Sequence, residues 1–187
     1  MKRLALALLV TTLPSCGADN QPMNERNGGT AVENATLTKL ELTSDAFKDG
    51  QAIPTQFTCE GADQSPALSW DDGPQGTQSF ALIVDDPDAP SGTYRHWAVF
   101  DIPANAHGIA QGQGGQFPQA VNDFGKTGYG GPCPPKGHGV HHYHFKLFAL
   151  DVEKLSLGSN PQVIDVENAA AKHALARGEL IGTYERK

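Results

Sequence analysis

Long apolar runs are missing from this 187-residue sequence. The nearest approach is LALALLV, which follows Lys2 and Arg3 and is too short to cross a bilayer as a helix. The basic start, the short apolar core and the letters LPSC at positions 13–16 predict an export signal over residues 1–15. Residues 16–35 have no apolar period and are predicted to be a flexible tether before a folded domain over residues 36–187.

Cysteine is scarce, with three residues in the chain. Cys16 ends LPSC, which resembles a bacterial lipobox, so we expect Cys16 to carry a lipid anchor; a plain secretory signal cut further on is the alternative. Cys59 and Cys133 are then the remaining thiols, and an oxidising compartment favours a disulfide between them. Two buried thiols that never meet are the alternative to this bridge.

Positive charge is also scarce, because 14 Lys and Arg stand against 21 Asp and Glu, for a formal net charge of −7. Removing residues 1–15 takes away two positive charges and no negative ones, so −7 becomes −9. An acidic body is unsuited to nucleic acid and to anionic lipid surfaces. Any anion site must therefore be built locally.

Familiar catalytic motifs are absent from the sequence. It has no Gly-x-Ser-x-Gly elbow and no Walker loop, and Cys59 and Cys133 have no adjacent base. We therefore expect a protein that is not an enzyme and that carries no cofactor.

Four histidines crowd into GHGVHHYHF, at positions 137–145, and raise the question of a metal site. His142 and His144 form a His-x-His pair, but no Glu follows it, so a cupin-type site is not matched. A strand would turn His141 to the face opposite that pair. We expect no metal, and zinc held by His141 with Asp86, Asp88 or His96 stays open as an alternative.

The remaining pattern is mostly β. Apolar alternation after residue 36 places Leu40 and Leu42 on one face, and the runs 79–86, 96–103 and 141–151 are short and rich in β-formers. One helix is predicted over residues 165–178, with Asp165 as N-cap and Gly178 as its stop, before a last strand at 179–186. These elements predict a β-rich sandwich.

Carboxylates cluster at the end of the strand 79–86, in DDPDAP at positions 85–90. Such a cluster is typical of a surface turn, but strand ends also assemble sites. A hairpin would return His96 beside Asp86 and Asp88, and an Asp partner would raise the cationic fraction of its ring.

The segments IPTQFTCEG, SFALIVDDPDAP, HWAVFDIP and GYGGPCPPKGHGVHHYHFKLFALD occur in an order that resembles the phosphatidylethanolamine-binding protein family, in its bacterial Raf-kinase-inhibitor-like branch. The resemblance covers nearly all of residues 36–187. It implies a mainly β fold, a sandwich of antiparallel sheets with one or two short peripheral helices, and a small pocket for an anion or a phosphoryl head group. The pocket residues implied are Asp86, Asp88, Tyr94, His96, Gly131, Pro135, His141 and Tyr143.

Further details follow from the same resemblance. Gly131 to Pro135 would form the lip of the pocket, and Ala89–Pro90 is expected to be a cis peptide. His142 stands where animal members carry Arg, which weakens the charge beside the pocket.

These observations predict a non-enzymatic binding protein of the cell envelope, on its periplasmic or extracellular face. Its partners would be a small anion or phosphorylated head group and, through the N-terminal lipid, a membrane, with no nucleic acid. An inhibitor that docks on a protease or a kinase is the first alternative, and a metal-dependent hydrolase using Asp86 and His96 is the second.

Overall fold

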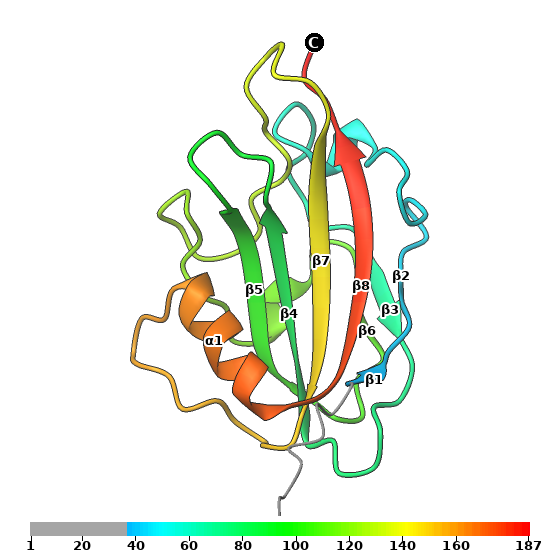
Figure 1. The fold of residues 1–187 in the computed structure, drawn as a ribbon, viewed down its shortest axis with the longest axis vertical. Coiled ribbons are helices and arrows are strands. Elements are labelled where there is room, and N and C mark those ends of the chain that lie inside the picture. Colours follow the sequence, from blue (N-terminus) through cyan, green and yellow to red (C-terminus); the bar gives the residue numbers. More distant parts are fainter. Residues whose placement is uncertain (1–36) are drawn as a thin grey trace, which may run out of the picture. The chain divides into compact units, whose positions relative to one another are not determined.

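The computed structural model describes residues 37–187, which form two sheets and one α-helix (Figure 1). The predicted signal and tether, residues 1–35, lie outside the described residues. The larger sheet has the strand order β1 (Thr38–Lys39), β8 (Ala174–Tyr184), β7 (His141–Leu150), β4 (Ser79–Asp86) and β5 (Tyr94–Pro103). The smaller sheet has the order β2 (Leu42–Thr43), β3 (Leu68–Trp70) and β6 (Gly108–Ile109). Short 3-10 turns lie at Thr55–Phe57 and Gly114–Gln116, and α1 spans Val163–His173.

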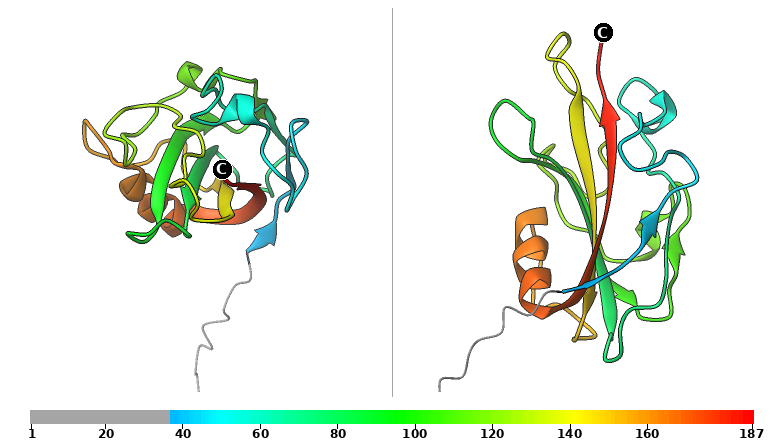
Figure 2. Two further views of the ribbon diagram at one scale, coloured as in Figure 1. Left: turned by 90° about the horizontal axis from the view of Figure 1, so that it is seen from above. Right: turned by 45° about the vertical axis from the view of Figure 1, so that its right-hand side comes forward.

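The large sheet is covered on both faces, by the small sheet on one side and by α1 on the other (Figure 2). Strand β4 is buried along its whole length, and its residues alternate between two cores. Phe80, Leu82 and Val84 face the small sheet, whereas Ala81 and Ile83 face α1. The predicted β-sandwich is therefore confirmed, with one peripheral helix.

This alternation determines where the end of β4 directs its polar residues. Because side chains alternate between the faces of a strand, Asp86 continues the row of Val84 on the inner face, whereas Asp85 belongs to the helix face. In β7, His141 likewise continues the inward row that includes Tyr143 and Phe145. The β4–β5 loop, the loop before β7 and the end of β8 lie at one end of the molecule (Figure 1).

The predicted helix is wrong at both ends. α1 begins after Gln162, and Asp165 is its third residue, where it accepts a hydrogen bond from the Gln162 amide at 2.9 Å. Residues 174–178 belong to β8, in which Gly178 pairs with Leu147. Pairing with β7, together with burial of alternate residues, overrides the helical propensity of ALAR.

The first predicted strand is divided between the two sheets, although Leu40 and Leu42 are both buried as expected. β1 pairs with β8 in the large sheet and β2 pairs with β3 in the small one, so the chain changes sheet between them.

The expected cis peptide at Ala89–Pro90 is wrong, since no peptide bond is cis within residues 37–187. The chain reverses instead through Gly92, which has φ of 95° and donates its amide to the Ala89 carbonyl at 3.0 Å. Glycine adopts this left-handed conformation without a steric penalty.

Gly182 of β8 is predicted to be essential for the packing of the two layers at the level of Tyr143, with which it pairs. A Cβ at Gly182 would lie 2.4 Å from Ile53 Cγ1 and 2.8 Å from Phe47 Cε2. We expect Gly182→Ala to lower the free energy of unfolding by about 1–3 kcal/mol, measured by urea titration. Gly158→Ala is the control, because nothing lies within 4 Å of its added Cβ, and equal stability of the two variants would contradict the prediction.

Candidate functional site

A cavity of about 310 Å³ opens at the end of the sandwich where β4 stops and β7 begins. Its polar lining comes from Asp86, Ser91, Tyr94, His96 and His141. The rest of the lining is Ala89, Pro90, Phe124, Cys133, Pro134 and Pro135. Five of the predicted pocket residues therefore share one cavity: Asp86, Tyr94, His96, Pro135 and His141.

Asp86 and His141 form a buried pair between the ends of β4 and β7. They are 3% and 1% exposed, and His141 Nδ1 donates to Asp86 Oδ2 at 2.7 Å. The other oxygen of Asp86 accepts the Asp88 amide at 2.9 Å. His141 Nε2 lies 2.8 Å from Nδ1 of the exposed His138, so both nitrogens of His141 are engaged.

His96 reaches the cavity because β5 carries a bulge. Val84 pairs with Trp97 but Asp85 pairs with Arg95, so His96 is the extra residue. A bulge redirects a side chain, and here the His96 ring contacts Tyr143 edge to face, with centroids 5.2 Å apart. His96 Nδ1 donates to the Gly130 carbonyl at 2.7 Å, which leaves Nε2 as the nitrogen for the cavity.

The expected cationic His96 is wrong in direction. Burial lowers the pKa of His96, and this effect outweighs the opposing Gly130 carbonyl and the Asp86 charge. Asp86 is paired with His141 instead, so His96 lacks the direct carboxylate partner that would stabilise its cation.

The two predicted tyrosines occupy different positions. Tyr94 lines the cavity, but its hydroxyl donates to the Asp123 carbonyl at 2.8 Å. Tyr143 lies deeper and is 0% exposed, with a hydroxyl that has no hydrogen-bond partner. Burial raises the pKa of Tyr143, and the charge of Asp86 raises it further. Tyr143 therefore remains a protonated potential donor below the cavity wall.

Asp88 and Gly131 do not line the cavity. Asp88 turns outward and accepts hydrogen bonds from the amide and Nδ1 of His142, at 2.9 and 2.7 Å. The Gly131 amide donates to Asp63 Oδ1 at 2.6 Å, and an added Cβ would lie 2.4 Å from the Phe57 carbonyl oxygen. Gly131 thus joins the lip to the segment that contains Phe57 and Asp63.

The predicted disulfide between Cys59 and Cys133 is present, with a Cα–Cα separation of 5.4 Å. It holds the lip beside Cys59, whose amide donates to the Pro132 carbonyl at 3.2 Å. Arg186 adds contacts to Cys133 Sγ and the Pro134 carbonyl, at 3.5 and 3.4 Å. The lip is therefore braced from two other segments of the chain.

Phe124 is a lining residue that the sequence reasoning missed. It is 40% exposed and packs edge to face against Tyr94 and His96, with centroids 4.9 and 5.2 Å apart. The sequence feature that could have indicated Phe124 is its position as an aromatic residue inside the polar turn segment NDFGK.

The zinc alternative finds no support in the arrangement of the ligands. Among residues 37–187 no three His, Cys, Asp or Glu side chains are grouped as a metal site. His141, the ligand common to the proposed combinations, already contacts Asp86 and His138.

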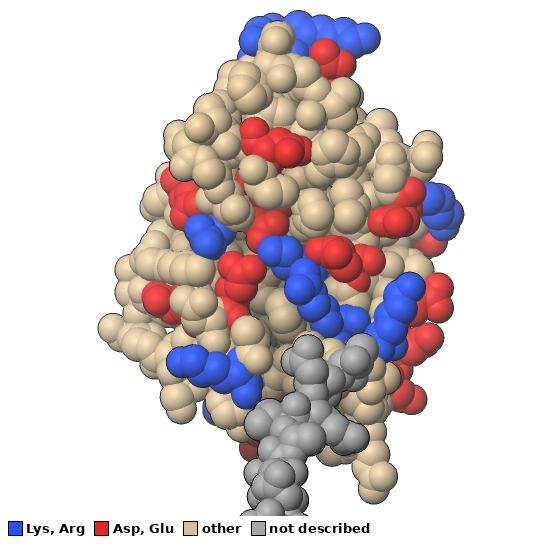
Figure 3. All heavy atoms as spheres, in the orientation of Figure 1, with Lys and Arg blue, Asp and Glu red and all other residues tan. Residues whose placement is uncertain are grey.

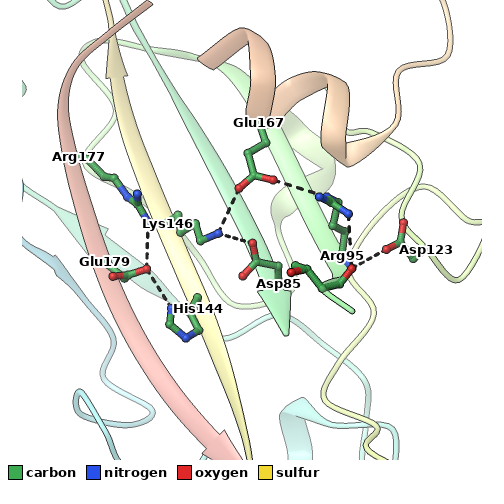
Figure 4. A network of polar contacts seen from close by, with 9 residues as sticks. Asp85, Arg95, Asp123, His144, Lys146, Glu167, Arg177 and Glu179 are labelled. Atoms are coloured by element: carbon green, nitrogen blue, oxygen red, sulfur yellow. Dashed lines mark hydrogen bonds and ion pairs between the residues drawn. The ribbon is translucent and has the colours of Figure 1, made fainter. Parts of the chain in front are cut away.

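The neighbouring carboxylate, Asp85, lies on the opposite face of the sheet, beside α1 (Figure 4). It pairs with Lys146, which also contacts Glu167 of α1 at 3.1 Å, and Arg95 lies 3.5 Å from Glu167. Burial raises the pKa of Asp85, while Lys146 opposes that shift. This network fastens α1 to the sheet and takes no part in the cavity.

Comparison with known proteins identifies the relatives of this chain. A family model described as "Phosphatidylethanolamine-binding protein" matches residues 43–185. An Aquifex aeolicus protein named "UPF0098 protein" is 47% identical over 156 residues, covering 79% of this chain and 89% of its own. The Mycobacterium tuberculosis protein named "Putative lipoprotein LppC" is 42% identical over 147 residues, covering 78% of this chain and 72% of its own.

A solved structure with a related name is also similar to this chain. The crystal structure of Escherichia coli YbcL, described as a new member of the mammalian PEBP family, superposes with a TM-score of 0.73 at 38% identity. The match covers 79% of this chain and 99% of YbcL.

The lowered pKa of His96 predicts a specific loss of stability in acid. The unfolded chain binds a proton on this histidine near its ordinary pKa of 6.5, whereas the folded protein resists protonation. The stabilising contribution of His96 is therefore present above that pH and declines below it. His96→Asn retains an amide donor for Gly130 but does not titrate. We expect wild type to lose more unfolding free energy than His96→Asn between pH 7 and pH 5, in urea titrations; parallel profiles would contradict this.

Proposed function

The chain belongs to the phosphatidylethanolamine-binding protein family, and on this premise we propose that it is a binding protein that holds a small phosphorylated group in the cavity beside Asp86 and His96. The observation that carries the proposal is the set of buried polar side chains that line the cavity. A volume of about 310 Å³ suits a head group or a small anion.

The same arrangement favours binding over catalysis. Nucleophilic catalysis requires a nucleophile beside its base. Here the chain of contacts from Asp86 through His141 ends at the ring of the exposed His138 instead of at a hydroxyl or a thiol. Cys133, the lining residue with a sulfur, is held in a disulfide.

The charge distribution supports a local site. On the face shown in Figure 3, Lys and Arg side chains lie among Asp and Glu side chains and form no field of one sign. With a net charge of −7, the chain has no general attraction for anions, so selectivity rests with the cavity.

Attachment to the cell envelope is part of the proposal. Its support is LPSC at positions 13–16 and a relative whose name includes "lipoprotein". Within residues 37–187, no helix has the length and apolar character needed to cross a membrane. An exported protein would not meet a cytosolic kinase, so kinase inhibition is not proposed.

Calorimetry with phosphoethanolamine tests the binding function. We expect saturable binding to the purified protein and at least about a tenfold loss of affinity in His96→Ala, equivalent to about 1.4 kcal/mol. His107→Ala is the control, because His107 is 56% exposed and does not line the cavity. The absence of heat with phosphoethanolamine, inorganic phosphate and methyl phosphate would refute the binding function.

Anchoring is tested by cell fractionation and intact mass. We expect the mature protein to begin at Cys16 with added acyl mass and to sediment with membranes, and Cys16→Ser to release it. Asn24→Ser, a matched change in the proposed tether, should stay with the membranes. An unmodified N-terminus beyond Cys16 would contradict the anchor.

A further inference from the structure

The side chains that line the cavity offer a ligand more hydrogen-bond acceptors than donors. Within the described part of the chain, none of its lining residues is Lys or Arg. Arg186 lies behind the lip, where it contacts Cys133 and Pro134 and is 3.4 Å from Glu60. An ordinary site for a fully ionised anion would place such a cation against the ligand.

The polar side chains that line the cavity leave few donors for a ligand. Tyr94 gives its hydroxyl hydrogen to Asp123, and His141 has both nitrogens engaged. Asp86 accepts two hydrogen bonds, whereas an ionised carboxylate offers about four lone-pair positions. His96 donates through Nδ1 to Gly130, so the Nε2 of a neutral ring is an acceptor.

The groups around Asp86 and His96 reinforce this imbalance. The titratable side chains near them are Asp85 and Asp88 from β4 and its turn, Tyr94 from β5, Tyr143 and His141 from β7, and His138 from the loop before β7. Lys146 is engaged by Asp85 and Glu167 on the helix face. Two side-chain donors remain among the described residues of the cavity and its wall, the Ser91 hydroxyl at the rim and the buried Tyr143 hydroxyl.

We infer that the cavity selects phosphoryl ligands that bring their own proton, namely monoesters in the hydrogen phosphate form, with Asp86 and His96 Nε2 as the acceptors. This inference rests on the proposed binding function and specifies its ligand class. A P–O–H group pointed at the Asp86 carboxylate makes a charge-assisted hydrogen bond, whereas an ionised oxygen there would face like charge. The burial of His96 is consistent with this inference. Burial lowers the pKa of His96 and so disfavours its protonated ring, which would be the other source of a proton for the ligand.

Three organic probes of similar size, together with inorganic phosphate, separate the possibilities. Methyl phosphate can carry a proton, whereas methyl sulfate and dimethyl phosphate stay fully ionised near neutral pH and have none to give. A site built to accept a hydrogen bond from its ligand strongly rejects an analogue that lacks the donor. Dimethyl phosphate also represents the diester of a lipid head group, and inorganic phosphate represents a free ion.

Calorimetry on the mature protein from pH 5.5 to pH 8.5 tests the inference. We expect methyl phosphate and inorganic phosphate to bind at least about a hundredfold more tightly than methyl sulfate or dimethyl phosphate at pH 6. Above the second phosphate pKa of about 6, the affinity for methyl phosphate should fall about tenfold per pH unit. Binding of methyl sulfate or dimethyl phosphate within about threefold of methyl phosphate would overturn the inference and leave the binding function standing. No binding of any probe would overturn both.

Asp86→Asn tests the role of the carboxylate. The asparagine amide can donate to His141 Nδ1, because His141 can shift its proton to Nε2 and donate to His138 instead, so the buried chain of contacts can persist. We expect methyl sulfate to gain at least about tenfold in affinity relative to methyl phosphate. Asp101→Asn, at the far end of β5, removes the same charge and should leave the ratio unchanged. An unchanged ratio in folded Asp86→Asn would overturn the inference, and the three-probe comparison on wild type decides if that variant does not fold.

Discussion

The hydrogen bond between Asp86 and His141 is the interaction on which the rest of the site depends. Both side chains are almost fully buried, and a buried carboxylate is tolerated when hydrogen bonds and a partner satisfy it. The pair joins the last residue of β4 to the first residue of β7, beyond Asp85 and His144, the last paired residues of the two strands. It also fixes the tautomer of His141, because Nδ1 must donate to the carboxylate. Removal of either partner would leave an unpaired polar group at the end of the core.

The geometry around this pair follows from the regular alternation of one strand and the irregularity of its neighbour. Strand β4 sends Asp85 to the helix face and Asp86 to the inner face, so adjacent carboxylates serve a structural network and a cavity. Strand β5 carries a bulge at His96, so His96 lines the cavity while the next residue, Trp97, packs into the inner core; a strictly alternating strand would send these two side chains to opposite faces. Regular strand pairing alone would place Asp86 at the cavity but would not place His96 there.

The sequence predicted the features that depend on local pattern. The strand 79–86, the inward row of β7 and the outward direction of His142 follow from a period of two, and the disulfide followed from cysteine scarcity combined with export. Features that depend on tertiary context were missed. Pairing with β7 changed ALARG from helix to strand, Asp63 took the Gly131 amide, and burial reversed the expected charge preference of His96. None of these competing partners is adjacent in sequence to the residue it affects.

Because the lip is held rigidly, the cavity cannot compensate for its lack of Lys and Arg side chains by moving when a ligand binds. A disulfide, the Gly131–Asp63 hydrogen bond and the contacts of Arg186 hold residues 131–135 before any ligand arrives, so little conformational entropy is lost on binding. A rigid wall cannot move a distant Lys or Arg onto an unmatched anion. The ligand must therefore fit the donors and acceptors that are already present. Because the carboxylate of Asp86 is buried in the cavity wall, the cavity can distinguish ligands by their protonation state more than by their net charge.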